Sequence, residues 1–225
     1  MTTSKEKKAK ADGAGVTITP PNMKHATFTI EGTSYLCMNA FPEKARQQIE
    51  TEQEKGQAGK NTKKKKEPKN FDECYKNAMH TSIQGWHGIP AAGLRSAMIS
   101  ACRVAGFTMT RAKLSVFVEQ DGFDRNDKMP LVKITKGVPE KQTHPVRLPN
   151  GSIDIRARAF FNPGWQADVK VKWDGDQFGL EDMANLLWRV GEQVGVLEGR
   201  PDSKQSCGMG WGTFKIINKK ERKAA

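Results

Sequence analysis

The fold is decided by residues 146–173, VRLPNGSIDIRARAFFNPGWQADVKVKW, in which apolar and polar residues alternate with the period of two that β-strands show. A turn sequence at residues 149–152 precedes the first alternating run, and Asn162-Pro163-Gly164 separates it from the second. The pattern predicts two neighbouring strands, each with one apolar face. Their polar faces should place four basic side chains side by side: Arg156, Arg158, Lys170 and Lys172.

Two amphipathic helices are predicted on either side of these strands. In residues 88–106, Pro90 suits the first helical position and Gly106 suits the cap beyond the end. Four apolar residues there should form a buried stripe: Leu94, Met98, Ala101 and Ala105. In residues 180–194, five apolar residues should face inward: Met183, Leu186, Leu187, Val190 and Val194.

Further strands are predicted by short alternating segments at residues 26–40 with a bend at Gly32, 114–118, 131–135 and 213–217. A polar helix should begin after Pro42 and dissolve into the Lys-rich stretch 55–69, which offers nothing to a core. The order strand, helix, strands, helix, strand is typical of an α+β fold.

Positive charge is distributed very unevenly along the chain. The net charge is +12 and the isoelectric point is near 9.6, which favours a polyanionic partner such as nucleic acid or an acidic membrane surface. Residues 1–13 carry +2, residues 55–69 carry +6 and residues 218–225 carry +3, so the rest of the chain carries only about +1. We interpret residues 1–22 as a disordered basic tail and residues 218–225 as a second basic tail.

Several protein classes are excluded by the composition. No apolar run approaches the roughly 18 residues of a membrane span and no secretory signal is evident, so we expect a cytoplasmic protein without a membrane partner. A metal site built from Cys74, His80 and His87 would match no familiar ligand spacing. We therefore predict no metal and no cofactor. The widely spaced cysteines should be reduced thiols: Cys37, Cys74, Cys102 and Cys207.

Three features could bind a nucleic-acid strand. The lysine run 63–66 could clamp a phosphate backbone through counterion release, or it could be a solvated loop. The basic strand pair could bind phosphates while Phe160 stacks on bases, although basic side chains also protect strands from edge pairing. The Gly-rich segment 199–212 lacks the ending of a nucleotide-binding P-loop. It could be a plain turn, or its glycines could let backbone amides approach phosphates beside Arg200 and Lys204.

An enzyme would need one of the histidines as its acid–base group. His80, His87 and His144 are the candidates, but no nucleophile or carboxylate pair stands at a telling spacing around them. Lone histidines are more often structural. We therefore predict no catalytic residues and no small-molecule substrate.

Three motifs, in their order along the chain, resemble known families. Residues 88–98, GIPAAGLRSAM, resemble the helix start Ile-Pro-Gly-Ser-Ser-Leu-Lys-Gly of the RAMP superfamily, the RNA-binding subunits of CRISPR effector complexes. Residues 194–214 are similar to the C-terminal Gly-rich loop and strand of that superfamily. Residues 30–38, the Lys-rich insertion and the same ending also resemble a family of uncharacterised phage and prophage proteins.

The resemblance implies a modified ferredoxin-like, RNA-recognition-motif-like domain over residues 23–217. Its antiparallel sheet would carry helices on one face and a flexible Lys-rich insertion at about residues 43–75. The expected function is non-enzymatic binding of single-stranded nucleic acid, RNA rather than DNA, by a phage-encoded protein that forms a homo-oligomer along the strand. The alternatives are an RNA-cleaving RAMP-like endoribonuclease that uses a histidine, and a structural phage protein.

The residues expected to contact the strand are Lys63, Lys64, Lys65, Lys66, Arg95, Arg156, Arg158, Phe160, Lys170, Lys172, Arg200, Lys204 and Trp211.

Overall fold

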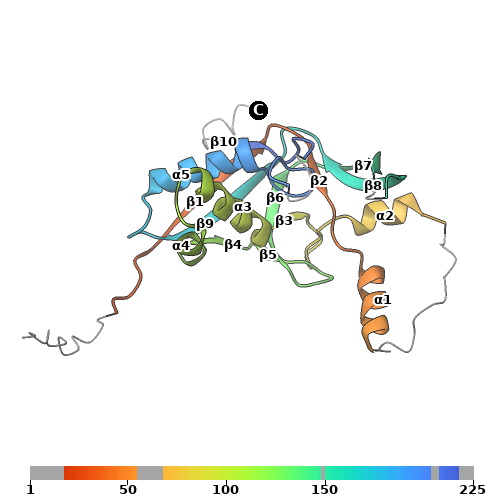
Figure 1. The fold of residues 1–225 in the computed structure, drawn as a ribbon, viewed down its shortest axis with the longest axis horizontal. Coiled ribbons are helices and arrows are strands. Elements are labelled where there is room, and N and C mark those ends of the chain that lie inside the picture. The colour runs from red at the N-terminus through yellow and green to blue at the C-terminus, as the bar shows by residue number, and fades with distance from the viewer. Residues whose placement is uncertain (1–17, 55–67, 148–149, 204–207, 218–225) are drawn as a thin grey trace, which may run out of the picture.

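A computed structural model describes residues 18–54, 68–147, 150–203 and 208–217 (Figure 1). The strands form two antiparallel sheets, which confirms the predicted mixture of helices and antiparallel strands. The larger sheet runs in the order β10 (Phe214–Ile217), β1 (Met23–Gly32), β9 (Gln166–Asp174), β6 (Pro130–Lys136) and β3 (Gly88–Pro90). Two short strands complete it: β4 (Val116–Glu119) on β9 and β5 (Gly122–Phe123) on β6.

Strand β9 lies in the middle of this sheet. It pairs with β1 along its whole length, while β4 and β6 share its other edge. The alternation predicted for it is confirmed, because Val169, Val171 and Trp173 are all buried in the core and the residues between them face away from it.

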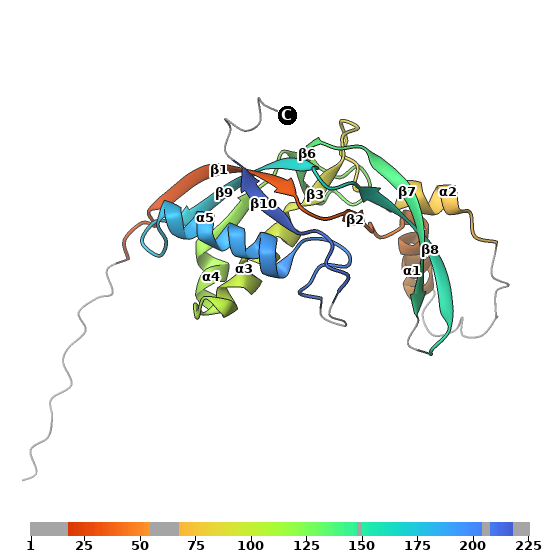
Figure 2. The same cartoon turned by 90° about the horizontal axis from the view of Figure 1, so that it is seen from above.

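Helices cover one side of the larger sheet (Figure 2). They are α3 (Ala91–Val104), α4 (Met109–Ser115) and α5 (Leu180–Arg189), and α5 continues as the π-helix η2 (Val190–Val194). All five residues predicted to face inward from α5 and η2 are buried. In α3 the predicted stripe is buried except Ala105, which is exposed because the helix ends at Val104. Part of the strand predicted at 114–118 is instead the end of α4, and Leu114 is exposed.

The smaller sheet consists of β2 (Leu36–Met38), β8 (Ile153–Phe161) and β7 (Pro139–Arg147). Strands β7 and β8 form a long hairpin (Figure 2). The prediction that β8 and β9 are neighbours is therefore wrong. Between them the chain crosses from one sheet to the other beside Gly32, whose N–H donates to the Trp165 carbonyl at 2.8 Å and whose carbonyl accepts from the N–H of Gly164 at 2.8 Å. The buried Trp165 ring lies directly against Gly32 and holds this corner.

The described ends of the predicted insertion are helical. Helix α1 (Glu43–Glu54) begins after Pro42, as predicted, and α2 (Phe71–Asn77) precedes the return to the core. Helix α2 packs on the β7–β8 hairpin, where the Tyr75 hydroxyl donates to the Pro139 carbonyl at 2.9 Å. The Lys-rich residues 55–67, and residues 1–17 and 218–225 of the predicted tails, lie outside the described residues. No helix in the described ranges is long and apolar enough to span a bilayer.

Candidate nucleic-acid interface

The open face of the larger sheet, which points away from the helices, carries charges of both signs. Strand register places four lysines there, Lys136, Lys170, Lys172 and Lys215, together with three carboxylates, Glu31, Glu119 and Asp168. Lys170 Nζ lies 2.7 Å from Asp121 Oδ1 at the edge of the face, and Lys215 Nζ lies 3.3 Å from Glu31 Oε1. Lys136 and Lys172 are the lysines on this face that form no ion pair with a described residue. The open face is therefore not the basic platform that the alternation predicted.

Arg156 and Arg158 lie on the other sheet, in the β7–β8 hairpin. Arg156 is directly opposite His144, and Arg158 is opposite Gln142. Arg158 Nε lies 2.9 Å from Glu198 Oε2, and only 12% of the Arg158 side chain is exposed. Arg156 is 34% exposed, with its Nε 3.7 Å from Asp154 Oδ2. Arg156 is thus the more available of the two to a phosphate.

An aromatic cluster lies on the same face of the hairpin and consists of Tyr35, His144, Phe160 and Trp211. Phe160 is its centre, and the other three rings stand edge-on to it at centroid distances of 6.2, 5.6 and 5.0 Å. Because these rings surround it, Phe160 is only 2% exposed and is not the open stacking surface that we predicted. Tyr35, His144 and Trp211 are the rings of the cluster that reach the surface, and Tyr35 was not predicted to belong to the site.

The Gly-rich loop, described at residues 195–203 and 208–212, brings Trp211 to the hairpin. Its glycines mostly allow the loop to pack on itself: a Cβ at Gly212 would lie 1.9 Å from the Val196 carbonyl oxygen, and one at Gly208 would lie 2.0 Å from that of Arg200. Gly210, with φ of +72°, has open space around it. Gly208, Gly210 and Gly212 are the glycines predicted to approach phosphates, and of these Gly210 is the one with room for a ligand.

The start of the Gly-rich loop is fixed to helix α3. Asp202 Oδ2 accepts a 2.6 Å hydrogen bond from Ser100 Oγ and lies 3.0 Å from Arg103 Nη2. The Ser100 hydroxyl, followed by the Arg103 guanidinium, lowers the pKa of the Asp202 carboxyl. Arg200 donates to the Leu197 carbonyl at 3.1 Å. The loop is thus held in place by charged hydrogen bonds to a core helix.

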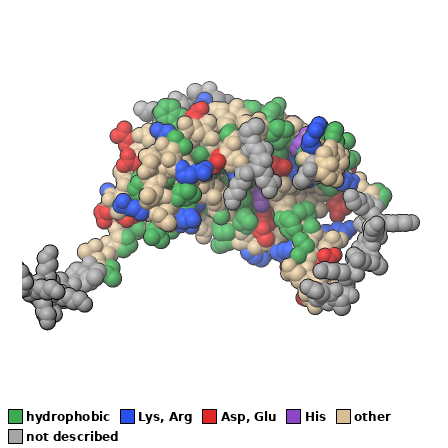
Figure 3. All heavy atoms as spheres, in the orientation of Figure 1, with side chains coloured by type: hydrophobic (Ala, Val, Ile, Leu, Met, Phe, Trp, Pro, Cys, Tyr) green, Lys and Arg blue, Asp and Glu red, His purple; other side chains and the backbone are tan. Residues whose placement is uncertain are grey.

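The remaining predicted contacts are distributed elsewhere. The Arg95 guanidinium donates to the carbonyls of Val116, at 2.8 Å, and Lys113, and its Cζ lies 4.8 Å from the centre of the Phe117 ring. Arg95 therefore ties α3 to β4, which leaves it little freedom to bind a phosphate. Lys63, Lys64, Lys65, Lys66 and Lys204 lie outside the described residues. Figure 3 shows the basic side chains of one face scattered among acidic and uncharged ones.

Two of the histidines considered as general bases contact polar side chains within the fold. His80 is buried with Nδ1 3.6 Å from Asp124 Oδ2, and His87 Nδ1 lies 3.2 Å from Thr81 Oγ1. Burial lowers the pKa of both imidazoles. The described residues contain no group of three or more side chains arranged to bind a metal ion.

We expect the folded state to lose stability as the pH falls below about 6.5. Burial lowers the pKa of His80, His87 and His144 in the folded protein, so the unfolded chain binds more protons in this range. Protonation therefore favours unfolding. Urea unfolding at pH 7.5, 6.0 and 5.0 should show a falling midpoint, and His80→Gln should flatten the slope. A midpoint that is constant across these pH values would contradict the prediction.

No protein-family model matches the sequence, and a search of curated proteins finds no significant relative.

Proposed function

We propose that this chain binds single-stranded nucleic acid, RNA rather than DNA, without catalysing a reaction. The observation that carries the proposal is the position of the aromatic cluster directly beside Arg156 on the β7–β8 hairpin. Single-strand binders combine cations for the phosphates with aromatic rings for the bases. The hairpin and the Gly-rich loop provide both within one surface.

The proposed path follows the hairpin and avoids the open face of the larger sheet. On the open face, each of Lys170 and Lys215 already neutralises a carboxylate, so a phosphate gains little from these two lysines. On the hairpin, Arg156 is only loosely paired, with 3.7 Å to Asp154. We therefore expect Arg156→Gln to weaken binding, whereas Lys215→Gln should leave it unchanged.

A ferredoxin-like core of the RAMP type is part of the proposal. The strand order β10-β1-β9-β4, with α3 between β1 and β4 in the chain and α5 between β9 and β10, supports it. The proposal extends to a phage-encoded protein that acts in the bacterial cytoplasm and assembles as a homo-oligomer along the strand. The resemblance of residues 88–98 and 194–214 to the RAMP superfamily supports this extension.

Replacing Lys63, Lys64, Lys65 and Lys66 by glutamine is expected to weaken binding and to make it less sensitive to salt. Each phosphate contact on a single strand contributes about 0.7 to the slope of log affinity against log salt, so four contacts contribute roughly 3. Fluorescence anisotropy of labelled 30-nucleotide RNA and DNA would measure the slope. The salt concentration should vary from about 50 to about 300 mM, a range that includes physiological ionic strength. The proposed function is wrong if the wild-type chain shows no salt-sensitive binding to either strand.

RNA cleavage is a second candidate because of one observation at His144. Its Nδ1 is buried without a hydrogen-bond partner, and burial, opposed by Glu198 and helped by Arg158 and Arg156, lowers the pKa of the imidazole, which favours its neutral form. A neutral imidazole can act as a general base. Incubation of labelled RNA with the wild type and with His144→Ala tests this. RNA that stays intact with the wild type eliminates cleavage.

A further inference from the structure

We infer that the aromatic cluster is a nucleobase site, in which one base of the bound strand stacks on Trp211 while its polar edge meets His144. The inference rests on the proposed function and adds to it that the bases, and not the phosphates alone, are recognised. The ligand class is a single-stranded nucleic acid with at least one unpaired, accessible base.

The rings of the cluster are held in fixed orientations. Phe160 is buried at its centre, and the His144 and Trp211 rings stand at 90° and 85° to it. Trp211 is fixed by its backbone N–H, which donates to the Gly199 carbonyl at 3.1 Å, and by its ring, which would lie 2.3 Å from a Cβ at Gly199. A ring that is already ordered loses little conformational entropy when a base stacks on it.

The cluster also has polar atoms that no described residue satisfies. His144 Nδ1 is buried and has no hydrogen-bond partner. An unsatisfied buried polar atom costs about 1–3 kcal/mol, so a ligand group that hydrogen-bonds to it would recover this free energy. The Tyr35 hydroxyl and Trp211 Nε1 likewise form no hydrogen bond with the described part of the chain. Base edges carry the donors and acceptors that such ring atoms can bind.

The charges around the cluster favour a base over the alternatives. Glu198 holds Arg158 at 2.9 Å, and its carboxylate repels a phosphate that would enter beside that arginine. Arg156 and Arg158 in turn oppose a cationic ligand, which aromatic clusters otherwise attract. A neutral base meets neither penalty, and the phosphate attached to it can reach Arg156, which lies opposite His144 on the neighbouring strand.

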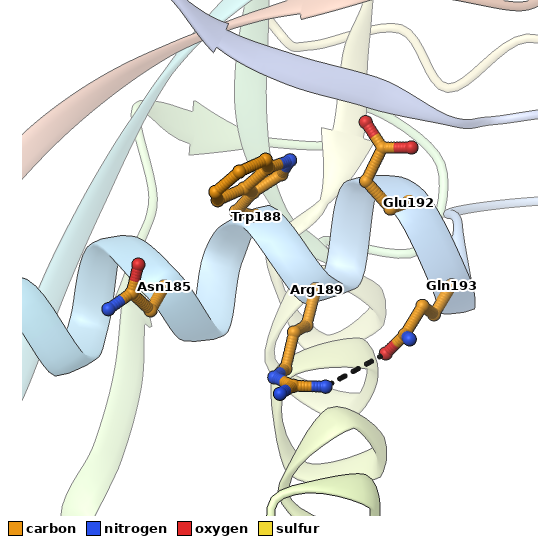
Figure 4. A pocket seen from close by; sticks show the side chains of 5 residues that line it. All are labelled: Asn185, Trp188, Arg189, Glu192 and Gln193. Atoms are coloured by element: carbon orange, nitrogen blue, oxygen red, sulfur yellow. Dashed lines mark hydrogen bonds between the residues drawn. The ribbon is translucent and has the colours of Figure 1, made fainter.

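Trp188 provides a matched control for Trp211. It is 57% exposed on α5 and borders a hollow of about 380 Å³ with Asn185, Arg189, Glu192 and Gln193 (Figure 4). Arg189 is close by and donates to Gln193 Oε1 at 3.4 Å. Trp188 is therefore an exposed tryptophan beside an arginine, but it is not part of the aromatic cluster.

The test compares an RNA oligonucleotide of about 12 nucleotides, within the usual site size, with an oligonucleotide of equal length whose central nucleotides are abasic. Both carry the same phosphates. Because stacking contributes about 1–3 kcal/mol per base, the wild type should bind the intact strand at least about tenfold more tightly. Trp211→Ala should reduce this ratio to about twofold or less, whereas Trp188→Ala should preserve it.

The outcomes separate the inference from the function on which it rests. If neither oligonucleotide binds to the wild type, both the proposed function and the inference are wrong. If both bind equally well, the strand is held by its phosphates alone and the base site does not exist. Because this comparison uses the wild type, it stands even if Trp211→Ala fails to fold. His144→Phe keeps the ring and removes its nitrogens, and a ratio that it leaves unchanged would overturn the role of His144.

Discussion

Gly191→Ala is expected to destabilise the protein by about 3 kcal/mol or more. Gly191 is buried in η2, and a Cβ there would lie 1.9 Å from the carbonyl oxygen of Phe214 and 2.9 Å from its ring. The oxygen belongs to the backbone of β10, so no rotation of a side chain can relieve the clash. Either η2 or the edge strand of the larger sheet must move. Thermal unfolding should show a midpoint lowered by roughly 6–12 °C.

Gly93→Ala is the matched control for this prediction. Gly93 lies within α3, and a Cβ there would have the Pro90 Cβ as its nearest neighbour at 3.8 Å, an ordinary contact. A glycine in a helix interior costs about 0.5–1 kcal/mol relative to alanine, so this change should stabilise the protein slightly. If both variants unfold at the wild-type temperature, η2 does not pack on β10 as described.

Strands and helices with strong periodicity could be predicted from the sequence. The alternation at residues 167–173 and the helical spacing at 183–194 arise because one face of each element is buried in the same core. Strand β7 was missed because it begins at Pro139, Pro145 interrupts it and none of its residues is fully buried. A segment without a buried face has no pattern to detect.

Strand partners could not be predicted in the same way. Asn162-Pro163-Gly164 is a good turn sequence, and a turn is present, but it leads from one sheet to the other. The deciding contact is between Trp165 and Gly32, which are more than a hundred positions apart in the chain. Periodicity reports which face of a strand is buried and says nothing about its neighbour.

The candidate site was predicted in part, and the errors have one physical origin. Arg156 and Phe160, which were assigned to one strand face, do come together with Trp211 from the Gly-rich segment. Whether a basic side chain is free depends on acids elsewhere in the chain: Glu198 pairs with Arg158, and Asp121 pairs with Lys170. His144 was considered only as an acid–base group and Tyr35 was not considered, because their contacts with Phe160 join segments that are far apart in the sequence.

Glu198→Gln is expected to bind nucleic acid about tenfold more tightly than the wild type while it becomes slightly less stable. The glutamine keeps the shape of the side chain but removes the charge that neutralises Arg158, at 2.9 Å. The Arg158 guanidinium then attracts a phosphate beside Arg156. One added phosphate contact should steepen the salt slope by about 0.7. The weakened hydrogen bond should reduce the stability by about 1 kcal/mol.

Glu192→Gln separates this local effect from the change in net charge. Glu192 is an exposed residue of η2, and its replacement adds the same unit of positive charge to the protein away from the hairpin. Anisotropy titrations of both variants against one RNA at several salt concentrations provide the comparison. Equal tightening in both would mean that only net charge matters. Weaker binding by Glu198→Gln would mean that Arg158 serves the ligand only while Glu198 holds it in place, and the hairpin surface would then depend on this ion pair for its shape.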